Sequence, residues 1–202
     1  MPVDVREAVV AALEAIGEAL VIEAKNVGFG YGGRSVIDGL TTTIMRGDKV
    51  GIIEGVSTTF NAQQRTLGYQ DAMKAANITV VGVQSGNWEI EKGNTVAAGM
   101  MREHPDLVAL LAGNDSMALG AVAAVKAAGK TGKVQVVGYD NIGAIKPMLA
   151  DGRVLATADQ YAAKQAVFGI ELAQKALAAK TPQNQLPATV KTEVVLVTKD
   201  SK

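Results

Sequence analysis

Apolar residues recur along the chain with two different periods, and the period changes near residue 49. Within residues 4–18 and just beyond, they are spaced three or four positions apart, as on one face of a helix: Val5, Val9, Ala12, Leu13, Ile16 and Leu20. Segments 20–24 and 37–44 are rich in β-branched residues, and several glycines separate them. The pattern predicts an N-terminal amphipathic helix, followed by two antiparallel strands around a tight turn near Gly32 and Gly33.

From residue 49 onward, short apolar runs alternate with helical patterns. The runs cover 49–55, 78–86, 107–115, 134–141 and 154–160, with a last strand pattern within 190–200. The helical patterns lie at about 61–76, 89–103, 116–128, 142–150 and 161–179. Near-continuous apolar strands between helices are typical of a parallel sheet that is covered on both faces. We therefore expect an α/β fold, a three-layer sandwich with a mainly parallel doubly wound sheet in 49–202, after a helix and β-hairpin preface in 1–48.

Composition and charge remove several classes of function. Twenty basic and twenty acidic residues cancel, so no net charge draws in nucleic acid or an anionic membrane. The absence of cysteine excludes thiolate catalysis and Cys-based zinc sites, and the single histidine excludes a His-rich metal site. The N-terminal residues lack a signal-peptide pattern, and no run approaches the roughly 20 apolar residues of a membrane span. The sequence as written predicts a soluble, cytoplasmic chain without a metal or a cofactor.

Polar side chains follow successive strands of the expected sheet. They come in four pairs: Gln84 and Ser85, Asn114 and Asp115, Asp140 and Asn141, and Asp159 and Gln160. The carboxyl ends of parallel strands share one edge, where open α/β folds bind ligands. Arg65 and the single tryptophan, Trp88, come shortly after two other strands. Amide, carboxylate and guanidinium groups suit hydroxyls, and an aromatic face suits a sugar ring, so the expected ligand is an uncharged polyhydroxyl compound.

Four stretches of this α/β body carry a family resemblance: KVGIIEGVSTTFNAQQRTLGYQDAMKA, HPDLVALLAGNDSMALGAVAAVKAAGK, VQVVGYDN and DGRVLATADQ. Together they resemble the C-terminal lobe of ribose-type periplasmic sugar-binding proteins, the solute-binding components of bacterial ABC importers. The resemblance implies that Arg65 donates to sugar hydroxyls and that Trp88 stacks on the ring. It implies that Asn114, Asp140 and Gln160 supply the other polar contacts from this lobe. ABC importer permeases are the implied partners, and the parent family is periplasmic.

The preface is similar to a different family. LVIEAKNVGFGYGGRSVIDGLTTTIMRGDKVGII, within about 19–53, resembles the opening β segment of soluble, duplicated-domain ABC ATPases. In that family Tyr31 would stack on adenine. The phosphate loop G-x-x-x-x-G-K-[ST] does not follow, so the main source of nucleotide affinity is missing. Residues 28–33 fit G-x-G-x-x-G, but a strand pattern follows them instead of a helix, which indicates a turn. The two resemblances together indicate a chimera, engineered or recombined.

The expected function is a non-catalytic scaffold with one sugar-binding lobe. A ligand on a single lobe stays largely exposed to solvent. Hydrogen bonds worth about 1 kcal/mol each must then outweigh the translational and rotational entropy that the ligand loses on binding. We therefore predict a monosaccharide affinity no better than about 1 mM. Two alternatives stay open: a metal-assisted hydrolase that uses Asp115, Asp140 and Asp159, and a vestigial ATP-binding fragment around Tyr31. Apolar surface around Trp88, left bare by the missing lobe, also predicts a homodimer unless the preface covers the sheet.

Overall fold

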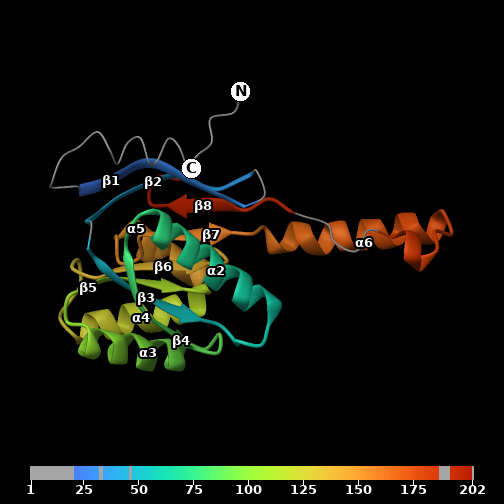
Figure 1. The fold of residues 1–202 in the computed structure, drawn as a ribbon. Coiled ribbons are helices and arrows are strands. Elements are labelled where there is room, and N and C mark those ends of the chain that lie inside the picture. The colour runs from blue at the N-terminus through green and yellow to red at the C-terminus, as the bar shows by residue number, and fades with distance from the viewer. Residues whose placement is uncertain (1–20, 32–33, 46, 187–191, 202) are drawn as a thin grey trace.

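The chain folds into one large sheet with helices on both faces and a separate hairpin beside it (Figure 1). The computed structural model describes residues 21–31, 34–45, 47–186 and 192–201. The large sheet has the order β4-β3-β5-β6-β7-β8. Its strands are β3 (Lys49–Glu54), β4 (Thr79–Ser85), β5 (Leu107–Ala112), β6 (Gln135–Tyr139), β7 (Ala156–Asp159) and β8 (Val195–Thr198). All neighbours pair in parallel except β8, which runs antiparallel to β7.

Helices cover the sheet on two sides and create two buried clusters. They are α2 (Phe60–Ala75), α3 (Ile90–Glu103), α4 (Asp115–Ala127), α5 (Lys146–Ala150) after the short 3-10 turn η1 (Gly143–Ile145), and α6 (Ala162–Ala178). The larger cluster joins α3, α4 and α5 to one face of the sheet, and the smaller cluster places Tyr69 and Met73 of α2 on the other. The apolar runs in the sequence are the strands that helices cover on both faces. In β5, for example, every residue except Val108 is buried. The expected three-layer α/β sandwich is confirmed.

Close packing between α3 and α4 fixes where the site-bearing ends of these helices lie. Gly120 of α4 lies so near the backbone of Ile90 that a Cβ atom there would overlap the Ile90 carbonyl oxygen. Asn94 strengthens the contact, because its side-chain amide donates to the Gly120 carbonyl at 3.1 Å. The N-termini of both helices are therefore held together at the carboxyl end of the parallel strands.

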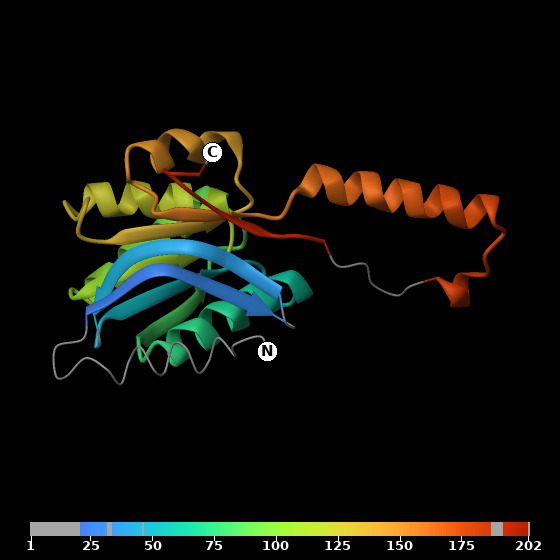
Figure 2. The same cartoon turned by 90° about the horizontal axis from the view of Figure 1, so that it is seen from above.

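The hairpin consists of β1 (Val21–Tyr31) and β2 (Arg34–Met45), which pair antiparallel from Val21 opposite Met45 to Tyr31 opposite Arg34. It forms a two-stranded sheet of its own, and β2 lies beside β8 (Figures 1 and 2). The expected hairpin is thus present, and it covers the β8 side of the large sheet without extending it. The helix expected over residues 4–18 lies outside the described residues.

Helix α6 leaves the carboxyl end of the sheet and projects away from the body in both views (Figures 1 and 2). None of its residues is buried. Its large apolar side chains are at least 39% exposed: Val167, Phe168, Ile170, Leu172 and Leu177. Helices gain most of their stability from packing of an apolar face, so a helix whose apolar side chains are this exposed is only weakly stable in water. Within the described part of the chain, no helix has both the length and the hydropathy that a bilayer crossing needs.

Candidate functional site

Arg65 of α2 is the centre of the site. Its Nη1 donates to the Gly113 carbonyl oxygen at 2.7 Å, and its Nη2 pairs with Asp140 Oδ1 at 3.2 Å. The guanidinium group lies over the Tyr139 ring, 3.8 Å from its centroid, and 5.5 Å from the centroid of Trp88. Only 12% of the Arg65 side chain is exposed. The guanidinium is therefore held in one orientation by a carbonyl, a carboxylate and two aromatic faces.

Asp140, which follows β6, connects Arg65 to Gln160. Its Oδ1 also accepts a hydrogen bond from Gln160 Nε2 at 2.7 Å. Burial raises the pKa of the Asp140 carboxyl above its ordinary value, while the charge and hydrogen bond of Arg65 act in the opposite direction. The residue has a φ of +110°, in a region that side chains other than glycine rarely adopt. The turn after β6 is therefore strained, as backbone at functional sites often is.

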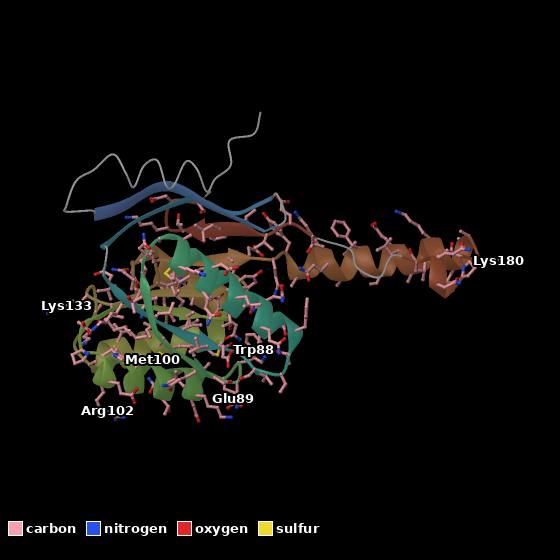
Figure 3. The ribbon with its side chains drawn as sticks, viewed as in Figure 1. Trp88, Glu89, Met100, Arg102, Lys133 and Lys180 are labelled. Carbon is pink, nitrogen blue, oxygen red and sulfur yellow. The ribbon has the colours of Figure 1, made fainter. Side chains whose placement is uncertain are left out.

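We call the cluster of side chains at the carboxyl end of the parallel strands the rim; it consists of Arg65, Trp88, Asn114, Asp140 and Gln160. Asn114 and Trp88 form its side next to α3 and α4. Asn114 is the N-cap of α4: its Oδ1 accepts from the Met117 amide at 2.9 Å, and its Nδ2 lies 3.5 Å from the Trp88 carbonyl oxygen. Trp88 adopts a left-handed conformation with φ +67°, and its ring packs so closely on Gly55 that a Cβ atom there would overlap it. Figure 3 labels Trp88 within the body, far from Lys180 at the tip of the projecting arm.

The structure brings together all five residues that the sequence singled out. Arg65 contacts Trp88 and Asp140, Asp140 contacts Gln160, and Asn114 approaches Trp88. Trp88 is half-buried, and Ile90, two positions further on, is 50% exposed, so the association expected around Trp88 stays a prediction. Five other exposed apolar residues lie on α6.

The sequence did not reveal the groups that contact the rim residues from the side of the sheet. Tyr139 supplies the face under Arg65, and Gly113 supplies a backbone carbonyl. Thr157 is fully buried in β7, where its hydroxyl donates to a carboxylate. Tyr139 could have been found, because it directly precedes Asp140 at a strand end. A carbonyl and a buried threonine leave no comparable signal in the sequence.

The three carboxylates proposed for metal-assisted hydrolysis do not share one environment. Asp115 is fully buried and accepts from Thr157 Oγ1 at 2.7 Å and from the Ile142 amide at 2.9 Å, and burial raises its pKa to about 6. Asp159 accepts from the Asn141 side chain at 3.0 Å and from the Tyr161 amide at 2.7 Å. Among the described residues no group of three or more His, Asp or Glu could hold a metal ion. The geometry does not favour the hydrolase alternative.

Tyr31, the residue expected to stack on adenine, ends β1 at the tip of the hairpin. The position of its side chain lies outside what the structure describes. The hairpin contacts β8, whereas the rim is formed after β4, β5, β6 and β7 and by α2.

Comparison with known proteins gives consistent matches. The family model described as "Periplasmic binding protein domain" matches residues 7–181. The D-ribose/D-allose-binding protein of Pseudomonas aeruginosa is 63% identical over 185 residues, which cover 88% of this chain and 58% of that protein. The ribose import binding protein of Escherichia coli is 33% identical over 160 residues, which cover 79% of this chain and 54% of that protein. Both relatives are named as sugar-binding proteins, and the name of the E. coli protein adds import.

Solved structures agree with the sequence matches. An ABC transporter solute binding protein from Burkholderia multivorans is 70% identical with a TM-score of 0.73, and the match covers 75% of this chain and 53% of that one. A periplasmic solute binding protein from Actinobacillus succinogenes, with bound D-allose, is 34% identical with a TM-score of 0.70; the match covers 76% and 54%. The chain spans about half the length of the curated relatives that it matches.

Proposed function

This chain belongs to the periplasmic binding protein domain family, and on that premise we propose that residues 49–202 form one monosaccharide-binding lobe. The observation that carries the proposal is the convergence of Arg65, Asp140 and Gln160, with Trp88 and Asn114 beside them, at the carboxyl end of the parallel strands. Its charged groups form a pair, so the rim suits an uncharged ligand better than a phosphate. The bound D-allose of one relative and the ribose named for others support the sugar class.

We expect the binding to be weak. The hydrogen-bonding groups of the rim are already paired with each other, so a sugar hydroxyl gains only the difference between a new bond and an existing one. Such net gains are about 1 kcal/mol each, and they must outweigh several kcal/mol of lost ligand freedom. The expected dissociation constant is no better than about 1 mM, equivalent to roughly −4 kcal/mol.

Titration calorimetry with D-ribose and D-allose tests the proposal. Asp140→Ala removes the acceptor shared by Arg65 and Gln160, so it should abolish the millimolar binding of the unaltered chain. Asp151→Ala is the matched control, because Asp151 also pairs with an arginine, Arg153, but does so on the exposed surface. Binding that survives Asp140→Ala, or that is lost equally in the control, would refute this rim as the site. Micromolar binding would show that one lobe is sufficient.

Partners and location follow from the same family. We propose that a full-length relative of this lobe delivers sugar to an ABC importer permease, as the name of the E. coli ribose import binding protein suggests for that protein. One E. coli relative is named a D-allose-binding periplasmic protein. The cytoplasmic location expected for the chain as written stays a proposal, which fractionation of expressing cells would test.

The origin of the hairpin is a separate proposal. We propose that the segment within about 19–53 derives from an ABC ATPase and that the chain is a chimera, although the family match spans this segment as well. A vestigial nucleotide site would depend on Tyr31. A fluorescent ATP analogue that binds the unaltered chain and fails to bind Tyr31→Ala would support that site. Equal signals from both proteins would dismiss it.

We also propose that two copies associate, and that α6 contributes more exposed apolar surface to this association than the region around Trp88 does. Ile170 is 60% exposed and Leu177 is 78% exposed. They lie seven positions apart and so face the same side of the helix. Exposed apolar surface of this kind usually pairs with something, and a second copy offers an identical helix.

A further inference from the structure

The turn that follows β6 places Asp140 in a conformation that residues other than glycine rarely adopt. Asp140 has a φ of +110° and Asn141 a φ of +54°, although neither residue is glycine. Asparagine tolerates the left-handed region, but a φ of +110° at an aspartate is unfavourable and persists only where surrounding groups hold it. The turn also carries the carboxylate that Arg65 and Gln160 share. The groups that hold the turn therefore decide where this carboxylate points.

Three consecutive amides of the turn each have a partner. The Asp140 amide donates to the Ala158 carbonyl at 2.7 Å. The Asn141 amide donates to Thr157 Oγ1 at 3.3 Å, and the Ile142 amide donates to Asp115 Oδ2 at 2.9 Å. The first partner is ordinary backbone, but the other two are side chains, so the sequence can change them without changing the strand.

Thr157 and Asp115 form one connected unit. Thr157 Oγ1 donates its hydrogen to Asp115 Oδ1 at 2.7 Å, which leaves its lone pairs free to accept from Asn141. Both side chains are fully buried. Asp115 lies in the first turn of α4, where the helix dipole favours a negative charge. Gly138 faces it so closely that a Cβ atom would overlap Oδ1, so the carboxylate lies directly against the β6 backbone.

We propose that Asp115, together with Thr157, is a positioning residue of the rim. The pair lies behind the rim and holds the strained turn so that Asp140 stays in reach of both Arg65 and Gln160. Asn114 and Asp115 are neighbours at the start of α4, but their side chains differ in position. Asn114 belongs to the rim, whereas Asp115 is buried in the core. The consequence for sugar binding rests on the proposed function, whereas the consequence for the turn does not.

Hydrogen exchange of single amides, measured by NMR on the full chain without sugar, tests the structural part. Asp115→Asn replaces one acceptor by an amide donor, and Thr157→Val removes the hydroxyl at nearly constant volume. Each should speed exchange at Asn141 and Ile142 by roughly tenfold or more, the effect of one lost buried hydrogen bond. Thr157→Ser restores the hydroxyl and should bring the exchange rates back near those of the unaltered chain.

Val136→Ala is the control for a general loss of stability. Val136 is fully buried near the start of the same strand, β6, four positions before Asp140. If Asp115→Asn and Thr157→Val speed exchange at the turn no more than Val136→Ala does, the proposal is overturned. If Asp115→Asn does not fold, the comparison of Thr157→Val with Thr157→Ser decides the matter.

Titration with D-ribose and D-allose provides the second arm. Thr157→Val should weaken binding by roughly fivefold or more, while Thr157→Ser and Val136→Ala should leave it near that of the unaltered chain. Equal weakening by Thr157→Val and Val136→Ala would overturn the positioning role in binding. If the unaltered chain binds neither sugar, the proposed function fails, and the exchange rates still decide whether Asp115 positions the turn.

Discussion

Replacing Arg65 by methionine removes the centre of the rim and leaves most of its packing in place. Methionine keeps an aliphatic stem against Tyr139 but has no donor for the Gly113 carbonyl and no charge for Asp140. Breaking a buried ion pair typically costs 3–5 kcal/mol, and an exposed pair contributes up to about 1 kcal/mol. The Asp140 side chain is 26% exposed and keeps its bond from Gln160, so this pair lies between these limits. We expect the free energy of unfolding to fall by roughly 2–3 kcal/mol.

The loss should depend on pH in a defined direction. Burial already holds the pKa of Asp140 above 3.8, and Arg65 opposes this rise, so Arg65→Met raises the pKa further. The folded variant then binds the Asp140 proton more tightly than the unfolded chain does, which lowers stability as pH rises through that range. The difference between the unaltered chain and the variant should therefore be small near pH 4 and largest at neutral pH.

Urea unfolding provides the measurement. Trp88 is the only tryptophan and lies beside Arg65, so its fluorescence follows the rim, and far-UV circular dichroism follows the sheet and helices. Arg153→Met is the matched control, since Arg153 pairs with Asp151 on the exposed surface, and we expect little change. A loss in Arg65→Met that is the same at about pH 4.5 and pH 7.5, or no larger than in the control, would refute this account of the rim.

Three further predictions follow from the same geometry. Burial raises the pKa of Asp115 from 3.8 to about 6, so the free energy of unfolding should fall by roughly 2 kcal/mol as pH rises from about 4 to about 6. Urea titrations of Asp115→Asn should show a flatter fall, and an unchanged slope would contradict the assignment. Gly55→Ala introduces a methyl group that overlaps the Trp88 ring, so it should destabilise the chain by about 1–3 kcal/mol and shift the Trp88 emission to the red; unchanged emission would mean that the ring is not confined. Ile170→Glu and Leu177→Lys should each reduce the mass measured by light scattering from that of a dimer to that of a monomer, and an unaltered chain that is already monomeric would rule out pairing through α6.

The alternation of strands and helices was predictable because both faces of the sheet are covered. Covered strands such as β3 and β5 require continuous apolar residues, and this pattern is visible in the sequence. The hairpin was predictable for another reason, since β-branched residues on both sides of glycines favour paired strands. The direction of α6 was not predictable. Its helical pattern is ordinary, and only the arrangement of the fold shows that α6 projects from the body with none of its residues buried.

The rim was predictable to the extent that topology determines it. Residues that follow parallel strands meet at one edge, which places Asn114, Asp140 and Gln160 together from their positions alone. What the sequence could not give is how they are paired. The contact of Arg65 with Asp140 joins residues 75 positions apart, and that of Thr157 with Asp115 spans 42. Contacts at such separations depend on side-chain direction, which local patterns do not encode.

The place where α6 begins connects the exposed helix with the rim. Ala162, its first residue, comes two positions after Gln160, and the helix extends from the same end of the sheet (Figure 1). We therefore expect a partner that packs on the first turns of α6 to lie close to a ligand on the rim and to exclude water from it. Hydrogen bonds strengthen when water is excluded, so the partner and the sugar should favour each other's binding. The weak affinity expected of the lobe alone is then the consequence of an open rim, and it should rise when α6 is covered.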